Sequence, residues 1–117
     1  MTIKEFSEKT KITISAIRYY DNLGLFPALS RDKSGYRDFS ENDIEWALFI
    51  NRLKDTGMKI KDIVNYSNLR NLGESTIAER LEILENHRFV LKEKIESDTY
   101  HLKNIDKKVE LYKKLLP

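Results

Sequence analysis

The sequence predicts a mainly α protein with a winged helix-turn-helix head, a small β-hairpin as the wing, and a long C-terminal helix that forms an antiparallel coiled coil in a homodimer. Three observations carry this prediction. Two short amphipathic segments flank a tight turn near the N-terminus, a basic stretch with proline and glycine follows, and a heptad repeat runs through the C-terminal part. We therefore expect a head domain at 1–70, a linker at 71–74 and a dimerisation helix at 75–117.

Composition limits the possible classes of protein. A chain of 117 residues buries too little apolar surface for two independent cores, so we expect a partner subunit. The 21 basic and 19 acidic residues nearly balance, and only residues 1–40, with seven basic and five acidic side chains, lean towards a polyanion. The absence of cysteine excludes disulfides, thiolate metal sites and thiol redox sensing. No apolar stretch has the length of a membrane span or the features of a secretory signal, so we expect a cytoplasmic protein without a membrane partner.

Two short helices are predicted at the start of the chain. Thr2 and Glu5 have the spacing of a capping box and begin a helix of roughly residues 2–9. Thr13 can cap a second helix, and Gly24 ends it. The apolar residues of the second helix face inward, and its polar residues that point elsewhere are Ser15, Arg18, Tyr19 and Asn22. Two short helices joined by a tight turn form a helix-turn-helix pattern.

A hairpin is predicted after the second helix. Pro27 cannot continue a helix, and residues 28–31 can extend. Residues 32–35 have the composition of a turn because they combine aspartate, lysine, serine and glycine. Residues 36–39 then lead the chain back. This pair of short strands is the expected wing.

Two further helices complete the predicted head. Ser40 and Asp43 again have capping-box spacing, and Gly57 ends the third helix. Apolar residues continue at helical spacing between 60 and 66, which predicts a shorter fourth helix. The linker then connects this helix to the C-terminal one.

A heptad repeat predicts that the C-terminal helix pairs with another helix. Apolar side chains recur at intervals of four and three over more than five heptads. At about 1.5 Å per residue the helix would span roughly 60 Å, which is too long to pack wholly on a small head. The seam positions expected to form the dimer are Leu81, Leu84, Arg88, Leu91, Ile95, Asp98, Leu102, Ile105 and Val109, and the repeat also includes Ile77, Tyr112 and Leu116.

The two charged seam positions, Arg88 and Asp98, predict the direction of the paired helices. In a parallel homodimer each charge would meet its own copy, which is repulsive twice. In an antiparallel pair about a two-fold axis near Glu93, Arg88 meets Asp98 and every apolar seam residue meets an apolar one. The alternative is that these charges lie at a frayed or displaced part of the seam. Extended further, the same register places Leu116 opposite Arg70 of the partner subunit, so each tail would touch the partner's head.

Three groups of side chains suit contacts with DNA. Reading a sequence needs several donors or acceptors on a helix that fits the major groove. The second helix offers Ser15, Arg18 and Tyr19; because Tyr19 and Tyr20 stand about 100° apart on a helix, one of them should pack and the other can offer its hydroxyl to a phosphate. The wing carries Arg31, Lys33, Tyr36 and Arg37 as a backbone clamp, and Lys59 and Lys61 stand where the fourth helix starts. The alternative for each cation is a solvated surface side chain, so the prediction rests on the order of the elements.

The head resembles the MerR family of bacterial regulators. The resemblance is carried by Ile-Ser-Ala-Ile-Arg-Tyr-Tyr-Asp at 14–21, by Leu-Gly-Leu at 23–25 with Pro27, and by Gly-Tyr-Arg at 35–37 with Phe39 and Ser40. It covers the chain from residue 2 to about residue 70, and the trailing coiled coil fits as well. It implies an antiparallel coiled-coil homodimer whose second helices enter major grooves while the wings lie against the backbone. The implied DNA contacts are Arg18, Tyr19, Tyr20, Tyr36 and Arg37, with Lys59 as a weaker candidate.

The resemblance also implies a function. Members of the family bind double-stranded promoter DNA and bend and untwist it, which realigns promoter elements for RNA polymerase. The cysteine-free sequence departs from the metal-sensing and thiol-sensing branches, and His87 and His101 lack clustered ligands, so we expect neither a metal nor a cofactor. The chain ends at Pro117 without room for a separate ligand-binding domain. A small-molecule effector, if one exists, would bind where head and coil meet, and the candidate lining is Ile83, Phe89, Val90, Trp46 and Tyr66, for which we favour plain packing.

Two other functions remain open from the sequence. A non-specific architectural DNA-binding protein would share the fold and rely on phosphate contacts alone. A protein-interaction adaptor would use only the coiled coil and would not bind DNA. An enzyme is not expected, because the sequence shows no constellation of nucleophile, base and acid and no glycine-rich phosphate loop.

Overall fold

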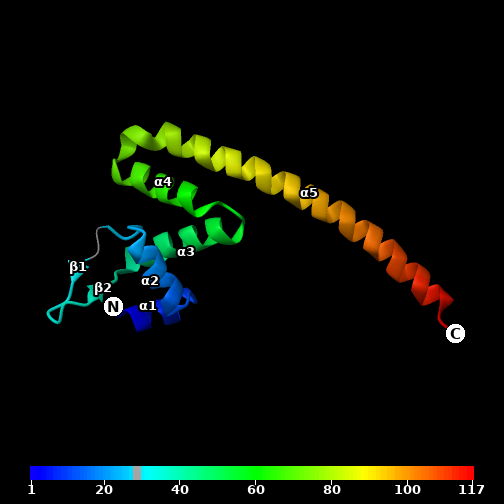
Figure 1. The fold of residues 1–117 in the computed structure, drawn as a ribbon, viewed down its shortest axis with the longest axis horizontal. Coiled ribbons are helices and arrows are strands. Elements are labelled where there is room, and N and C mark those ends of the chain that lie inside the picture. The colour runs from blue at the N-terminus through cyan, green and yellow to red at the C-terminus, as the bar shows by residue number, and fades with distance from the viewer. Residues whose placement is uncertain (28–29) are drawn as a thin grey trace. The chain divides into compact units, whose positions relative to one another are not determined.

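The structure, a computed structural model, describes residues 1–27 and 30–117, and the chain is mainly α-helical. Its elements are α1 (Ile3–Thr10), α2 (Ile14–Asn22), β1 (Ser30–Arg31), β2 (Arg37–Asp38), α3 (Glu41–Asp55), α4 (Ile60–Asn71), the 3₁₀ turn η1 (Glu74–Thr76) and α5 (Ile77–Leu115) (Figure 1). They form two compact units, Met1–Arg80 and Leu81–Pro117. The predicted order of helices is confirmed, whereas Ala28 and Leu29, which the prediction placed at the start of the hairpin, lie outside the described residues.

The helix starts lie where the capping residues predicted them. The Thr2 Oγ1 atom accepts a hydrogen bond from the Glu5 backbone N–H at 3.2 Å, and Thr13 Oγ1 accepts one from the Ala16 N–H at 3.1 Å. At α3, Asp43 accepts a hydrogen bond from the Ser40 N–H at 2.8 Å. Each of these bonds satisfies a backbone donor that a helix start leaves without an intrahelical partner. Local capping chemistry therefore sets three of the helix starts.

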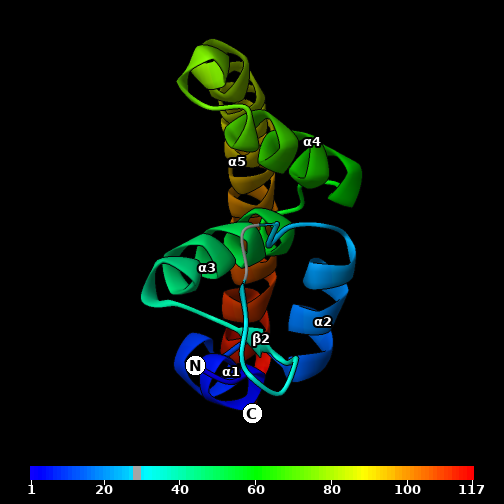
Figure 2. The same cartoon turned by 90° about the vertical axis from the view of Figure 1, so that its left-hand side faces the viewer.

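An aromatic cluster joins α1 to the base of the hairpin. Phe6 of α1 is fully buried, and its ring stacks on that of Phe39, with centroids 4.3 Å apart. Phe26 lies edge-on to Phe39 at 5.7 Å and to Phe6 at 6.1 Å. Because Phe26 follows α2 and Phe39 follows β2, the three rings hold both ends of the hairpin segment against α1. The helices complete the core: α1 packs on α2 and α3, and α3 packs on α4 (Figure 2).

A second cluster of rings joins α3 to α4. Trp46 and Tyr66 stack at 6.3 Å, and Phe49 lies within 6.2 Å of Trp46. The Trp46 indole N–H donates to the Leu25 carbonyl at 2.7 Å, and the Arg70 guanidinium lies 4.1 Å from the Trp46 ring centroid. Trp46 and Tyr66 are nearly buried within the head. Trp46 and Tyr66 thus pack within the head, whereas the interpretation favoured from the sequence, that they pack the long C-terminal helix onto the heads, stays a prediction.

The two strands pair antiparallel as a short hairpin. Ser30 lies opposite Asp38, and Arg31 lies opposite Arg37. The turn between the strands is closed by the Asp32 N–H, which donates to the Tyr36 carbonyl at 2.7 Å. Gly35 has a φ of +84°, a left-handed conformation that glycine adopts without the steric cost of a side chain. The hairpin is present where the sequence placed it.

The C-terminal helix starts two residues later than predicted. Residues Glu74–Thr76 form the 3₁₀ turn, and α5 begins at Ile77 and runs for 39 residues. The Thr76 hydroxyl donates to the Leu69 carbonyl at 2.6 Å and fixes this turn to α4. Arg70 lies on α4, within the head where the sequence analysis placed it, and the register that brings Leu116 opposite Arg70 of the partner subunit stays a prediction. Ile77, whose counterpart in the predicted antiparallel register is Val109, is the first residue of α5.

Two features that other classes of protein require are absent from the described residues. No helix in the described ranges has both the length and the apolar character needed to cross a membrane. Among the same residues, no group of three or more histidine, cysteine, aspartate or glutamate side chains is arranged to hold a metal ion.

Candidate nucleic-acid interface

The outer face of α2 presents the polar side chains that the sequence singled out. Ser15, Arg18 and Tyr19 are exposed, and Tyr19 retains 48% of its possible exposure. Within the described residues, no hydrogen bond or ion pair engages the Arg18 side chain. The inner face is formed by Ile17 and Tyr20, both with 0% exposure. Helix α2 is thus anchored on one side and carries a donor-rich face on the other.

Tyr20 packs inside the head, which removes it from the predicted DNA contacts. Its hydroxyl donates to Asn51 Oδ1 at 2.9 Å, and the Asn51 amide donates in turn to Asp55 at 3.4 Å. Burial, followed by the nearby Asp55 and Tyr19, raises the pKa of the Tyr20 phenol. The prediction that one of the adjacent tyrosines packs is confirmed. We carry Tyr19 forward as the candidate contact, because a fully buried ring cannot reach a phosphate.

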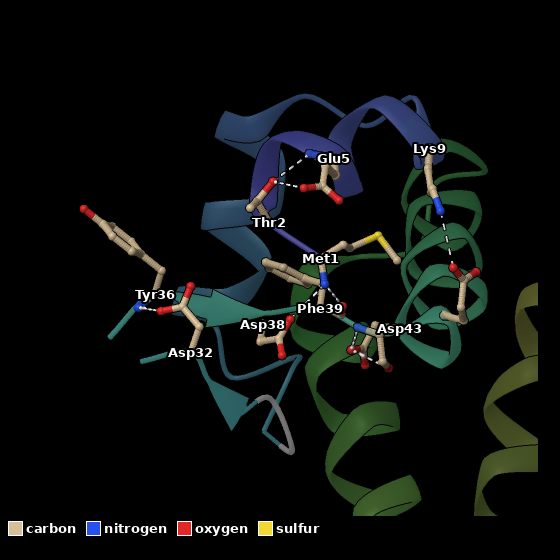
Figure 3. Close-up of polar contacts among 11 residues, drawn as sticks. Met1, Thr2, Glu5, Lys9, Asp32, Tyr36, Asp38, Phe39 and Asp43 are labelled. Atoms are coloured by element: carbon tan, nitrogen blue, oxygen red, sulfur yellow. Dashed lines mark hydrogen bonds and ion pairs between the residues drawn. The ribbon is translucent and has the colours of Figure 1, made fainter. Parts of the chain in front are cut away.

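The turn of the hairpin presents an aromatic and two basic side chains. Tyr36 is 73% exposed, and Arg31 and Lys33 are exposed as well. Asp32 shapes the turn, because its Oδ1 atom accepts hydrogen bonds from the Ser34 N–H at 2.9 Å and the Tyr36 N–H at 3.0 Å. The Tyr36 ring extends away from the other side chains in Figure 3. These three side chains are exposed, and their use as a backbone clamp stays a prediction.

Arg37 differs from its neighbours because its guanidinium is engaged inside the head. Its Nε and Nη2 atoms donate to the two oxygens of Asp21 at 3.0 and 2.5 Å. Nη2 also donates to the Phe26 carbonyl at 3.0 Å. The side chains of Arg37 and Asp21 are only 25% and 23% exposed. The sequence predicted Arg37 as an outward contact and did not single out Asp21 at all.

A groove of about 590 Å³ lies between the start of α1, helix α2 and the hairpin, and we call it the α2–hairpin groove. Its lining is Met1, Thr2, Ile3, Glu5, Arg18, Asp21, Arg31, Asp32, Tyr36, Arg37, Asp38 and Phe39. The groove therefore brings together Arg18 of the outer face of α2 and three of the four predicted clamp residues, which are Arg31, Tyr36 and Arg37. Lys33 and the pair Lys59 and Lys61 are not part of this lining.

The carboxylates of the groove are occupied within the head. Asp38 accepts a hydrogen bond from the Met1 amino group at 2.8 Å, and Glu5 accepts one from the Thr2 hydroxyl at 3.3 Å (Figure 3). Asp21 binds Arg37, and Asp32 binds the amides of its own turn. Of these four carboxylates, Asp21 and Asp38 are paired with a cation, whereas Glu5 and Asp32 are bound by neutral groups. A polyanion approaching this face therefore meets two neutralised carboxylates beside the positive charges of Arg18 and Arg31.

Lys59 and Lys61 lie at the start of α4 and are exposed. Lys59 is the residue that precedes the helix, and no side chain caps its first turn. The backbone N–H groups at a helix start favour an anion, and two lysines beside them add charge of the same sign. The structure leaves this position open as a second, separate candidate for a phosphate contact.

The seam positions of α5 are placed on a helix with no buried residue. Leu84 and Leu91 are partly exposed, and the other predicted seam residues are exposed: Leu81, Arg88, Ile95, Asp98, Leu102, Ile105 and Val109. An apolar stripe of this length on a single helix is typical of a helix that pairs with another one.

A helix-turn-helix with an exposed donor-rich second helix, an adjoining basic hairpin and a long helix with an apolar seam defines a class, that of DNA-binding regulators. Residues 1–69 match the family described as MerR HTH family regulatory protein. The chain therefore belongs to the MerR family of helix-turn-helix regulatory proteins, which are regulators and not enzymes.

Three relatives illustrate the match. An uncharacterized HTH-type transcriptional regulator of Haemophilus influenzae is 34% identical over 113 residues, which are 97% of this chain and 84% of that protein. The crystal structure of HiNmlR, a MerR family regulator lacking the sensor domain and bound to promoter DNA, matches with a TM-score of 0.89 at 34% identity and covers 97% of this chain and 86% of that one. A putative MerR family transcriptional regulator from Listeria monocytogenes has a TM-score of 0.90 at 36% identity, over 96% and 85% of the two chains.

Proposed function

We propose that this protein is a transcriptional regulator that binds promoter DNA sequence-specifically as a homodimer. The observation that carries the proposal is the construction of α2. Tyr20 and Ile17 fix its inner face in the core, while Ser15, Arg18 and Tyr19 stand exposed on the outer face. A rigid helix with exposed donors is what reading of base edges in the major groove requires. Membership of the MerR family and the likeness to a promoter-bound relative support the same conclusion.

The side chains divide into those that read bases and those that hold the backbone. Arg18 can fork onto a guanine or a phosphate, and a bidentate base contact contributes about 1–3 kcal/mol of discrimination. Tyr19 and the hairpin residues Arg31, Lys33 and Tyr36 contact phosphates, which fixes the register of the protein on the duplex. Lys59 and Lys61 hold a further phosphate at the start of α4.

The second subunit pairs with the exposed seam of α5. In the antiparallel register Arg88 meets Asp98 of the partner subunit, and Leu91 meets Ile95 of the partner subunit. The two heads are then related by a two-fold axis and read two half-sites of an operator. A fixed distance between the heads suits a regulator that bends and untwists promoter DNA for RNA polymerase, a deformation that costs of order 1–6 kcal/mol. A small-molecule effector that changes this geometry remains part of the proposal.

The decisive experiment compares specific with non-specific DNA. We would titrate the protein by fluorescence anisotropy against DNA from upstream of its own gene and against a scrambled duplex of equal length, at several salt concentrations. Arg18→Ala is expected to lose about 1–3 kcal/mol on the upstream DNA and much less on the scrambled one. Arg52→Ala, which removes an exposed arginine of α3 outside the α2–hairpin groove, is the matched control and should leave both affinities unchanged.

The other outcomes separate the competing functions. Equal affinity for both duplexes, with a steep dependence on salt, would favour a non-specific architectural protein or an operator elsewhere in the genome. No binding to either duplex would favour a coiled-coil adaptor. A loss of affinity in Arg52→Ala as large as that in Arg18→Ala would show only a dependence on total charge.

A further inference from the structure

We infer that Asp21 and Arg37 form a positioning pair that fixes the hairpin against α2, and that Arg37 itself does not neutralise a DNA phosphate. The inference rests on the proposed function, since it assigns a role to two residues of the same interface. It departs from what the resemblance implied for Arg37, and it gives Asp21 a role that its sequence pattern alone did not suggest.

The hydrogen bonds of Arg37 join the hairpin to α2. The Arg37 guanidinium donates two hydrogen bonds to the Asp21 carboxylate and one to the Phe26 carbonyl. Asp21 is in the last turn of α2, Phe26 lies in the segment that leaves this helix, and Arg37 is the first residue of β2. A single side chain thus joins three consecutive parts of the interface. The planar fork of arginine suits this arrangement, whereas a lysine ammonium cannot form the same parallel pair of bonds.

The Asp21 carboxylate also balances the positive charges of the hairpin. Arg31 and Arg37 lie directly opposite each other in the hairpin, and like charges in that relation destabilise a strand pair. The Asp21 carboxylate lies on Arg37 and offsets this repulsion, while Arg31 donates to the Gly35 carbonyl at 2.7 Å. The pair is about three-quarters buried, so its attraction is screened less by salt than that of an exposed pair. The hairpin therefore depends on a residue of α2 for its charge balance.

Asp21 also shares a side of α2 with Arg18, the side chain proposed to contact a base. Arg18 and Asp21 are three residues apart on α2, and side chains at that spacing lie on the same side of a helix. Both line the α2–hairpin groove, together with Arg37 and Tyr36. By fixing the angle between the hairpin and α2, the pair thus determines where the clamp residues contact the DNA backbone when Arg18 contacts a base. Holding the two elements in place before binding avoids an ordering cost at the moment of binding.

The effect of Asp21→Asn on DNA affinity distinguishes a positioning role from a purely electrostatic one, because the two roles predict changes in opposite directions. Asp21→Asn removes a negative charge from the interface, so an electrostatic role alone would make DNA binding tighter. A positioning role makes specific binding weaker, and we expect a loss of about tenfold. Arg37→Gln should lose the same factor, and the double variant should lose no more than either single one, because both changes break one interaction. Arg37→Lys keeps the charge and should fail to restore binding.

The salt dependence provides a second readout. Each phosphate that a cation neutralises contributes about 0.9 to the slope of log K against log salt concentration. Arg37→Gln should leave this slope at the wild-type value, whereas Lys33→Gln, a change on the same hairpin, should lower it by about 1.8, which is about 0.9 for each subunit of the dimer. A slope lowered by Arg37→Gln as much as by Lys33→Gln, or tighter binding by Asp21→Asn, would overturn the inference.

A measurement without DNA keeps the inference separate from the proposed function. In the free protein, Asp21→Asn and Arg37→Gln should both speed up amide hydrogen exchange in the hairpin, at the Asp32 N–H that closes the turn. Exchange at Ile17 in α2 and at Ile50 in α3 serves as the internal control for global unfolding. Faster exchange confined to the hairpin would support the pair even if the protein bound no DNA. Unchanged exchange at Asp32 would refute it even if the protein proved to be a specific regulator.

Discussion

The head and the helix that follows it obtain their stability in opposite ways. The unit Met1–Arg80 has a core of its own, in which Phe6, Ile17 and Tyr20 have no exposure at all. The unit Leu81–Pro117 is one stretch of helix in which no residue is buried, and Ile95 at its centre is 54% exposed. A long isolated helix gains little from backbone propensity, because most helical stability in proteins comes from packing. The chain therefore carries one domain with a core of its own and one helix without a buried residue, whose apolar stripe the proposed dimer would cover.

The sharpest way to break this comparison is to remove one phenylalanine from each unit. Phe6→Ala leaves a cavity among stacked rings and should lower the free energy of unfolding by about 3–5 kcal/mol. Phe89→Ala removes the same group from a site on α5 that is 63% exposed and off the seam, and should change it by less than about 0.5 kcal/mol. Urea unfolding followed by circular dichroism measures both. Equal losses would mean that the two units do not differ as described.

The seam charges sharpen the comparison at the level of the dimer. Either single swap, Arg88→Asp or Asp98→Arg, places like charges opposite each other at two symmetry-related contacts. Each such contact should cost dimerisation about 0.5–3 kcal/mol, and the double swap should restore it. Sedimentation equilibrium across a range of protein concentrations gives the dimer affinity. The same affinity in all four proteins would contradict the antiparallel register, and a weakened double variant would point to a displaced seam.

The smallest effect concerns the titration of Tyr20. Its phenol has a pKa raised above the ordinary 10.0 by burial, and so the folded state holds this proton more tightly than the unfolded state. The stabilising contribution is fully present below about pH 10 and is lost as the pH rises through the raised pKa, because the unfolded phenol ionises first. The free energy of unfolding should therefore fall more steeply above about pH 10 in the wild type than in Tyr20→Phe.

Tyr19→Phe is the matched control for this titration, because it removes a phenol hydroxyl from the adjacent position of α2, where the ring is about half exposed. Parallel curves for the wild type and Tyr20→Phe would contradict the expected dependence on pH.

The sequence predicts local features of this molecule well. Thr2, Thr13 and Ser40 begin helices because capping is chemistry between a side chain and an amide two or three residues away. The heptad repeat starts at Ile77, which is also the first residue of α5. The predicted bound at residue 75 differs by two residues because Glu74–Thr76 form a 3₁₀ turn, which the apolar pattern does not report.

Features that depend on distant partners could not be predicted in the same way. The sequence shows that Tyr19 and Tyr20 face different directions, but which one is buried depends on Asn51, thirty-one residues away from Tyr20. Arg37 was counted as surface charge because its carboxylate partner, Asp21, lies sixteen residues earlier. An acidic residue beside a basic face was the one available signal of that pair. The DNA contacts and the dimer remain proposals, because both depend on molecules outside the chain.

The arrangement of α2 has a consequence for how such a protein can acquire a new target. Its buried face and the bond from Asp21 to Arg37 maintain the fold, while Ser15, Arg18 and Asn22 contribute nothing to the core. If α2 reads bases as proposed, substitutions at these exposed positions should change which bases are preferred without a large change in stability. Recognition can therefore diverge between related proteins, or be redesigned, one exposed residue at a time on an unchanged scaffold.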